Sequence, residues 1–184
     1  MLFRSANLSY TTLTNAILAN ANLSGATLAD ADLTDATLTV TNLTGATLAN
    51  ANLANAILAY ATLTNASLAS ANLTNANLGY AWLNGARLSN TNLFNTNLSG
   101  TMLAGAYFYN NNLRNATLSN IDSRYATFYN VILTRANLAG ANLSNATLNN
   151  TNLSMANLAT TNFANATLVS VSSGGITEIG RAHV

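Results

Sequence analysis

The sequence predicts an all-β fold, a right-handed quadrilateral parallel β-helix of about eight four-sided coils. Two observations predict it. A hydrophobic residue recurs at every fifth position over residues 6–170, and a small residue stands two positions before it. These 165 of the 184 residues form 33 pentads without a break in frame. The central residue is Leu in all but four pentads, and the first residue is Ala in 23 of them.

A period of five fits neither standard element. On an α-helix a step of five residues rotates the chain by a net angle of about 140°, so the leucines would spiral over every side. On a flat strand an odd step sends alternate leucines to opposite faces. The leucines share one interior only if the chain turns a corner in every pentad. Four pentads, about 20 residues, then close one coil, and coils stack about 4.8 Å apart.

The pentad motif A(N/D)LXX, seen as ANLSG at residues 21–25 and ADLTD at 31–35, resembles the pentapeptide-repeat family. The resemblance covers about 90% of the chain and implies the quadrilateral β-helix of that family. Some members resemble DNA in shape and charge and protect or inhibit DNA gyrase. Because B-DNA carries about one charge per 1.7 Å, such a mimic would need some twenty acidic groups. The array has four Asp and four Arg, which argues against a DNA-mimic gyrase inhibitor.

The chain divides into four segments. Residues 1–5 are expected to form a partial or incoming coil, 6–170 the repeat β-helix and 171–177 the end of the array. Residues 178–184 resemble a translated sequencing adapter and are interpreted as a non-native tail. Neither end shows the polar cap that a solenoid needs. We therefore expect a longer natural chain, and uncapped coils that favour end-to-end self-association.

The composition excludes most kinds of catalytic and metal-binding site. Only 6% of residues are charged, Cys is absent, and the one histidine is His183. No nucleophile–base pair, metal cluster or phosphate-binding loop is present, so we expect no enzyme, no metal and no cofactor. The net charge of +1 gives no reason to bind nucleic acid or a membrane surface. Neither a signal peptide nor a transmembrane stretch is seen, and a cytoplasmic location is expected.

Departures from the repeat gather in a belt between Tyr80 and Arg135, which holds nine of the 13 aromatic residues and four of the six arginines. Residues 20 apart should be stacked neighbours, so Phe108 and Phe128 should pair inside the core. Outward pairs are predicted on all four faces: Arg87 with Tyr107 and Tyr109 with Tyr129 on one face, then Phe94 with Arg114, Tyr60 with Tyr80, and Trp82 with Met102 on the other three.

Exposed aromatic and arginine side chains are typical of protein interfaces, and they equally strengthen cross-strand stacks. Both interpretations stay open. The candidate partner-binding residues are Arg87, Tyr107, Tyr109, Tyr129, Phe94 and Arg114. The face that carries the first four is the best single candidate, and the identity of the protein partner is unknown.

Three smaller features have structural interpretations. Ser123 occupies a central position and predicts a gap or a bulge in its coil. Asp30, Asp32 and Asp35 are interpreted as a solvated polar surface, since a cation needs more converging oxygen ligands. Asparagines at 20-residue intervals predict amide ladders along the rod: Asn52, Asn72, Asn92 and Asn112, and likewise Asn55, Asn75, Asn95 and Asn115.

The sequence thus predicts a non-enzymatic, rigid and neutral rod that acts as a structural or interaction module. The alternative is an ice- or surface-binding β-helix, because threonines share one column of the predicted rod: Thr27, Thr47 and Ser67, then Thr127, Thr147 and Thr167. Arg87 and Tyr107 interrupt that column and weaken the alternative.

Overall fold

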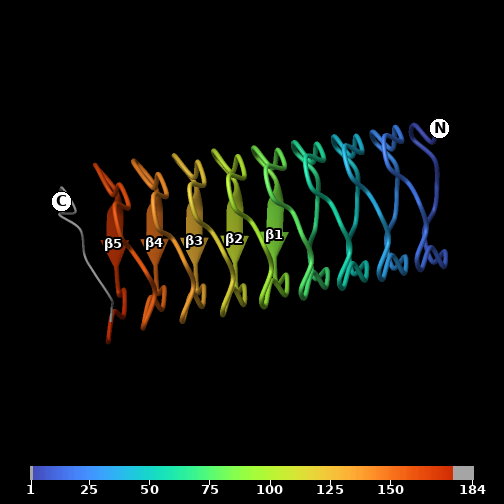
Figure 1. Ribbon diagram of the computed structural model, residues 1–184. Helices are drawn as coiled ribbons and strands as arrows, with labels where there is room; N and C mark the ends of the chain where they lie inside the picture. Colours follow the sequence, from blue (N-terminus) through green and yellow to red (C-terminus); the bar gives the residue numbers. More distant parts are fainter. Residues whose placement is uncertain (1, 176–184) are drawn as a thin grey trace.

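A computed structural model describes residues 2–175, which form a straight stack of four-sided coils (Figure 1). Parallel bridges join residues 20 apart along the stack, from Leu2–Asn22 to Asn152–Ser172. At 20 residues per coil, the described residues make between eight and nine coils. The predicted all-β quadrilateral fold is confirmed. The tail expected at 178–184 lies outside the described residues.

One side of the rod carries a continuous parallel sheet in the order β1-β2-β3-β4-β5 (Figure 1). Its strands are β1 (Arg87–Ser89), β2 (Tyr107–Tyr109), β3 (Thr127–Tyr129), β4 (Thr147–Asn149) and β5 (Thr167–Val169). Because side chains alternate along a strand, the middle residue points inward and its two neighbours point outward.

We name the four sides in chain order and include the corner residue that ends each one. Face A holds residues 27–30, face B 32–35, face C 37–40 and face D 42–45. Each face also includes the residues that lie 20 positions, or a multiple of 20, earlier or later in the sequence. The sheet β1–β5 therefore lies on face A.

Backbone hydrogen bonds join each coil to both neighbours. Leu23 N donates to Asn42 O at 2.7 Å and Gly25 N to Thr44 O at 2.8 Å, both in the next coil. Thr27 N donates to the preceding coil, to Ala6 O, at 2.9 Å. Since the same three bonds recur from pentad to pentad, the polar backbone is paired along the rod, as buried peptide groups require.

Every corner has the same backbone signature. The fifth residue of each pentad, from Ser5 to Gly175, has φ between 50° and 71°. The next residue closes the turn, as where Ala26 N donates to Leu23 O at 3.0 Å. A positive φ at the third residue of a four-residue turn is the mark of a type II turn, which favours Gly and Asn. This explains why the fifth position is so often Asn, Gly or Asp.

Some corners carry residues that dislike this conformation. Five of them have φ of 59° or 60°, where a side chain other than that of Asn or Asp costs about 1–2 kcal/mol: Val40, Tyr60, Tyr80, Tyr125 and Arg135. All except Arg135 are large apolar residues more than half exposed. Their burial therefore does not offset the strain. This conformational requirement was not predicted from the sequence.

Leucine and alanine columns fill the interior. Central leucines from Leu23 to Leu148 are at most 1% exposed, and the alanines beside them are nearly as buried. At the limits of the described coils, the central residue Phe3 is only partly buried and Leu168 is 46% exposed. The core is thus one continuous column that runs along the whole rod.

The coil around Ser123 is filled differently from the others. Ser123 is fully buried, and its Oγ has no hydrogen-bond partner. Larger side chains, Ile121 and Val131, take inward positions that are usually Ala, and Phe128 replaces a leucine. Ser123 N still donates to Asn142 O at 2.8 Å, so the expected bulge is absent and the backbone repeat continues.

Candidate interaction surface

The outward side chains of β1, β2 and β3 form a compact group on face A. Register places Arg87 beside Tyr107, and Tyr109 beside Tyr129. We call Arg87, Tyr107, Tyr109 and Tyr129 the tyrosine platform. All four were candidate residues, and the +20 spacing predicted both pairs.

The three tyrosine rings of the platform are nearly parallel. Tyr109 and Tyr129 stack across adjacent strands with centroids 5.4 Å apart and planes at 9°. Tyr107 and Tyr109 lie on the same strand, 6.4 Å apart and at 6°. The second pair was not predicted, because the 20-residue spacing describes neighbours between coils and not along one strand. Its signal in the sequence is the alternation Tyr-Phe-Tyr.

A buried aromatic pair supports the platform from below. Phe108 and Phe128 occupy the middle positions of β2 and β3, with centroids 4.7 Å apart and planes at 6°, and both are fully buried. The predicted core pair is therefore present. Because the backbone of both strands is fixed by this pair and by the ladder, the tyrosines need little further ordering to bind a partner.

The platform carries an uncompensated positive charge. Among residues 2–175 the one salt bridge joins Arg124 Nη2 to Asp122 Oδ2 at 2.8 Å, on face D. The hydrogen bond from Arg124 lowers the pKa of Asp122 below its usual value. Arg87 makes no such pair, so its guanidinium is available to an acceptor on another molecule.

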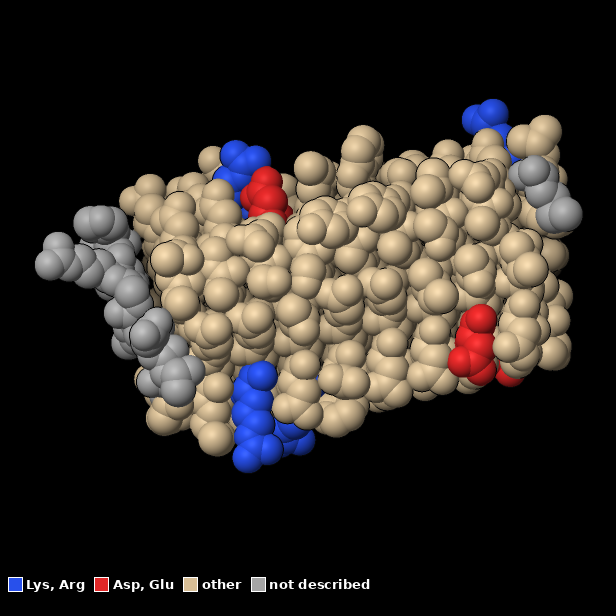
Figure 2. All heavy atoms as spheres, in the orientation of Figure 1, with Lys and Arg blue, Asp and Glu red and all other residues tan. Residues whose placement is uncertain are grey.

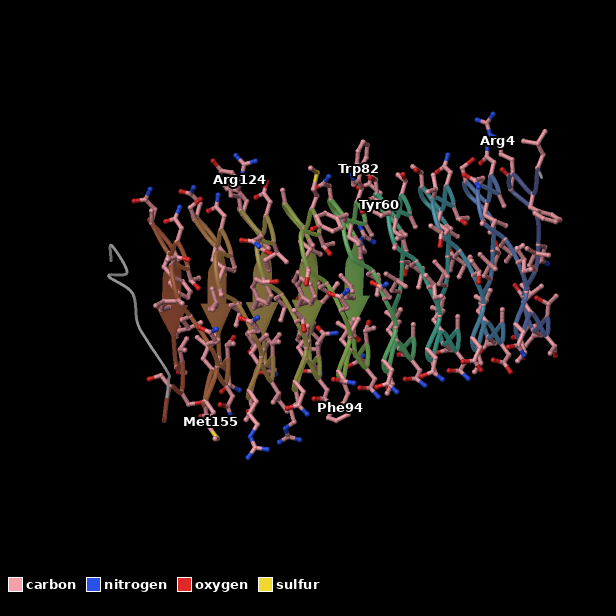
Figure 3. All side chains as sticks on the ribbon, in the orientation of Figure 1. Arg4, Tyr60, Trp82, Phe94, Arg124 and Met155 are labelled. Carbon is pink, nitrogen blue, oxygen red and sulfur yellow. The ribbon has the colours of Figure 1, made fainter. Side chains whose placement is uncertain are left out.

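The remaining candidates lie on other faces. Phe94 and Arg114 belong to face B and do not join the platform. Figure 3 shows Phe94 on the lower edge of the rod. Tyr60 and Tyr80 stack at the corner of face C with centroids 5.4 Å apart, as predicted. A Cβ at Gly100 would lie 2.5 Å from Tyr80 Cε1, so the glycine leaves room for that ring. Trp82 and Met102 are adjacent on face D.

The amide ladders exist but are interrupted. Asn72 Nδ2 donates to Asn52 Oδ1 at 3.0 Å, whereas Asn92 Nδ2 donates to Thr74 Oγ1 at 2.9 Å instead of to the previous asparagine. In the second column Asn75 Nδ2 donates to Asn55 Oδ1 at 3.2 Å. Asparagines in the second pentad position also accept from the backbone two residues on, which fixes the approach to the corner.

The three aspartates lie where the sequence placed them, on faces A and B. Asp32 accepts hydrogen bonds from Thr34 N at 3.1 Å and from Asn52 Nδ2 at 3.3 Å. Hydrogen bonds from Thr34 lower the pKa of Asp32. Among the described residues no three His, Cys, Asp or Glu side chains are placed to hold a metal ion. Nor does that part of the chain contain a helix with the length and apolar character to cross a membrane.

Comparison with known sequences identifies one family. The family described as "Pentapeptide repeats" matches residues 3–39, 31–75, 71–110, 112–150 and 141–171, in eight copies. These ranges cover nearly the whole array. No curated protein matches the sequence.

Solved structures also resemble the rod. QnrB1, a plasmid-mediated fluoroquinolone resistance protein, is 14% identical with a TM-score of 0.63, over 91% of this chain and 86% of that one. HetL, involved in heterocyst differentiation regulation in the cyanobacterium Nostoc sp. strain PCC 7120, is 28% identical with a TM-score of 0.32, over 96% and 86% of the two chains. The likeness to QnrB1 shows a shared fold alone.

Proposed function

The chain belongs to the pentapeptide-repeat family, and we propose that it is a non-enzymatic rod that binds a protein partner through the tyrosine platform. One observation carries the proposal: three nearly parallel tyrosine rings and an unpaired arginine lie together on a face whose other outward side chains, apart from Tyr10 and Asp30 near the N-terminal end, are mostly small and uncharged. Tyr and Arg are the residues most enriched among those that dominate binding energy.

The surroundings of the platform favour a protein over a charged ligand. On face A the coils before it present small outward side chains such as Thr47 and Ala49, and those after it present Thr147 and Asn149. Rings held against each other offer their edges and hydroxyl groups to a partner. A flat aromatic centre with a neutral polar rim has the composition of a protein interface.

The test is affinity capture from the source organism with a matched control. The tagged wild type is compared with the triple variant Arg87→Ala/Tyr107→Ala/Tyr109→Ala. The control is Tyr60→Ala/Tyr80→Ala, which removes a stacked tyrosine pair from a different face. We expect a protein that wild type and control recover and the triple variant loses. If all three recover the same proteins, the platform is only a structural stack.

Ice or surface binding is the second candidate, and a specific observation favours it. Thr27, Thr47 and Ser67 are joined by consecutive parallel bridges, and so are Thr127, Thr147 and Thr167. Hydroxyl groups thus repeat at the coil spacing of about 4.8 Å on two parts of face A. Thermal hysteresis and ice-crystal shape test this function, and its absence at millimolar protein removes the candidate.

A further inference from the structure

Face B carries opposite charges at its two ends. Asp35 and Arg135 occupy the same corner column, five coils apart, which is about 24 Å along the rod. Asp32 lies beside the first and Arg114 one coil before the second. Figure 2 shows acidic and basic side chains along one lower edge of the rod, the acidic ones nearer the N-terminus.

The corner column between Asp35 and Arg135 is uncharged. Four asparagines fill the corner column from one end to the other: Asn55, Asn75, Asn95 and Asn115. All four are exposed. Each primary amide offers two donors and an acceptor, of which the ladder along the rod uses only part. An amide column can therefore hydrogen-bond to an identical column.

We propose that two copies of this chain pack face B against face B as antiparallel rods. A two-fold axis perpendicular to the rod, midway between Asp35 and Arg135, places each aspartate opposite the arginine of the other copy. The same axis sets Asn55 opposite Asn115 and Asn75 opposite Asn95. The interface is isologous, because one patch meets an identical patch.

Phe94 supports the position of the axis independently of the charges. It is the one aromatic side chain on the described part of face B, and it is 37% exposed (Figure 3). The axis passes between the coils of Asn75 and Asn95, and Phe94 belongs to the second of them. The two copies of Phe94 then lie about 4.8 Å apart along the rod, at the centre of the interface. Phe is enriched at protein interfaces, and the residues that dominate binding energy gather near the centre of the interface.

Charge selects the orientation and the face. In a parallel pair Asp35 would face Asp35, and Arg135 would face Arg135, which is unfavourable. Among described residues, face C has no charge, and the opposite charges of face D, Asp122 and Arg124, already pair with each other. On face A, Asp30 and Arg87 stand in different columns, so the same kind of axis would not set one opposite the other. A standard interface uses about 800 Å² per partner, and one of four faces of a rod with 8077 Å² of accessible surface provides that area.

Charge reversal tests the pairing by sedimentation equilibrium on the full chain. The wild type should sediment at about twice 19.1 kDa. Asp35→Arg and Arg135→Asp should each weaken self-association at least tenfold, about 1.4 kcal/mol, because each puts like charges at both ends of the interface. An equimolar mixture of the two variants should dimerise again, since the arginine introduced at position 35 of one then meets the aspartate introduced at position 135 of the other.

The controls separate this interface from other causes. Arg4→Asp makes the same charge change as Arg135→Asp on face D and should dimerise like the wild type. Phe94→Ala should weaken the dimer without changing the circular dichroism. A monomeric wild type at 100 µM, single variants that dimerise like the wild type, or a mixture that stays monomeric overturns the proposal. If the protein dimerised end to end instead, Arg135→Asp would not weaken its self-association. Partner capture by the platform is unaffected, because Asp35 and Arg135 lie outside it.

Discussion

Two coils of the rod, residues 46–65 and 121–140, have equally buried interiors built from different side chains. In the first, the inward positions are four alanines and four leucines, all at most 1% exposed. In the second they include Ile121, Ser123 and Phe128, with the same low exposure. The interior of a coil therefore requires a certain total volume of side chains, and it does not require Leu and Ala at every position of the motif. A small residue is tolerated where its neighbours are larger.

The second region is irregular in other ways. The two buried side-chain atoms without a hydrogen-bond partner in residues 2–175, Asn111 Oδ1 and Ser123 Oγ, lie in it or in the coil before it. The three tyrosines of the platform lie on the same two coils, and Arg87 lies on the coil before them. Natural proteins depart from the usual packing and hydrogen-bonding preferences mainly at functional sites. The unpaired buried atoms in the coils that carry the tyrosines are therefore consistent with the proposal that the platform is a binding surface.

The largest expected effect tests whether the two interiors are equally well packed. Leu58→Ala in the first coil and Leu138→Ala in the second should each lower the free energy of unfolding by about 3–5 kcal/mol, because both leucines are fully buried. Urea denaturation measures the loss. A loss at Leu138 less than half of that at Leu58 would show that the irregular coil is loosely packed. Thr62→Ala, on the outer surface, serves as the control.

A smaller effect tests the exchange of volume. Ser123→Leu restores the repeat in sequence but should lower the free energy of unfolding by about 1–3 kcal/mol, because Ile121 and Phe128 already fill that coil. The double variant Ile121→Ala/Ser123→Leu should be more stable than the two single losses predict, with a coupling of about 0.5–3 kcal/mol. If urea denaturation shows that the double variant loses the sum of the two single losses in free energy of unfolding, the two side chains do not share one volume.

The next effect concerns the corners of the regular region. Val40 has φ of 59° and is 53% exposed, so it bears strain with little burial. Val40→Asn should raise the free energy of unfolding by about 1 kcal/mol, because Asn accepts this conformation. Val40→Ala is the matched control and should gain less. If the asparagine variant has the same thermal midpoint as the wild type, the positive φ at Val40 does not strain the fold.

The smallest effect is the pH dependence of the pair between Asp122 and Arg124. Because folding lowers the pKa of Asp122, the pair stabilises the fold at neutral pH, and that contribution disappears as the pH falls through the lowered pKa, below 3.8. The pair is exposed to solvent, which screens it, so its contribution to stability is small. Asp122→Asn should remove this part of the acid sensitivity. Denaturation curves of both proteins between about pH 2 and 6 measure it, and identical pH profiles would contradict it.

Most of the neighbouring pairs of the candidate site could be predicted from the 20-residue period. Because residues 20 apart are neighbours, the sequence predicted Phe108 with Phe128, Tyr109 with Tyr129 and Tyr60 with Tyr80. The 20-residue period could not predict contacts between residues of the same strand, such as Tyr107 and Tyr109. It also could not predict the interruption of an amide ladder, since a side chain chooses among nearby acceptors only when the coils are in place.

The positive φ at the corners could have been predicted and was missed. The excess of Asn, Gly and Asp at the fifth pentad position is its signal, since these residues tolerate the left-handed region. Recognising it would have marked Val40, Tyr60 and Arg135 as strained from the sequence alone.

The sequence by itself determined the coil, because a hydrophobic residue at every fifth position is buried only when the chain turns at each pentad. It also determined which residues become neighbours, since the period never changes. Tertiary structure alone decided how the interior around Ser123 is filled and how the tyrosine rings of the platform lie. Packing and ring orientation depend on several coils at once, and no single pentad contains that information.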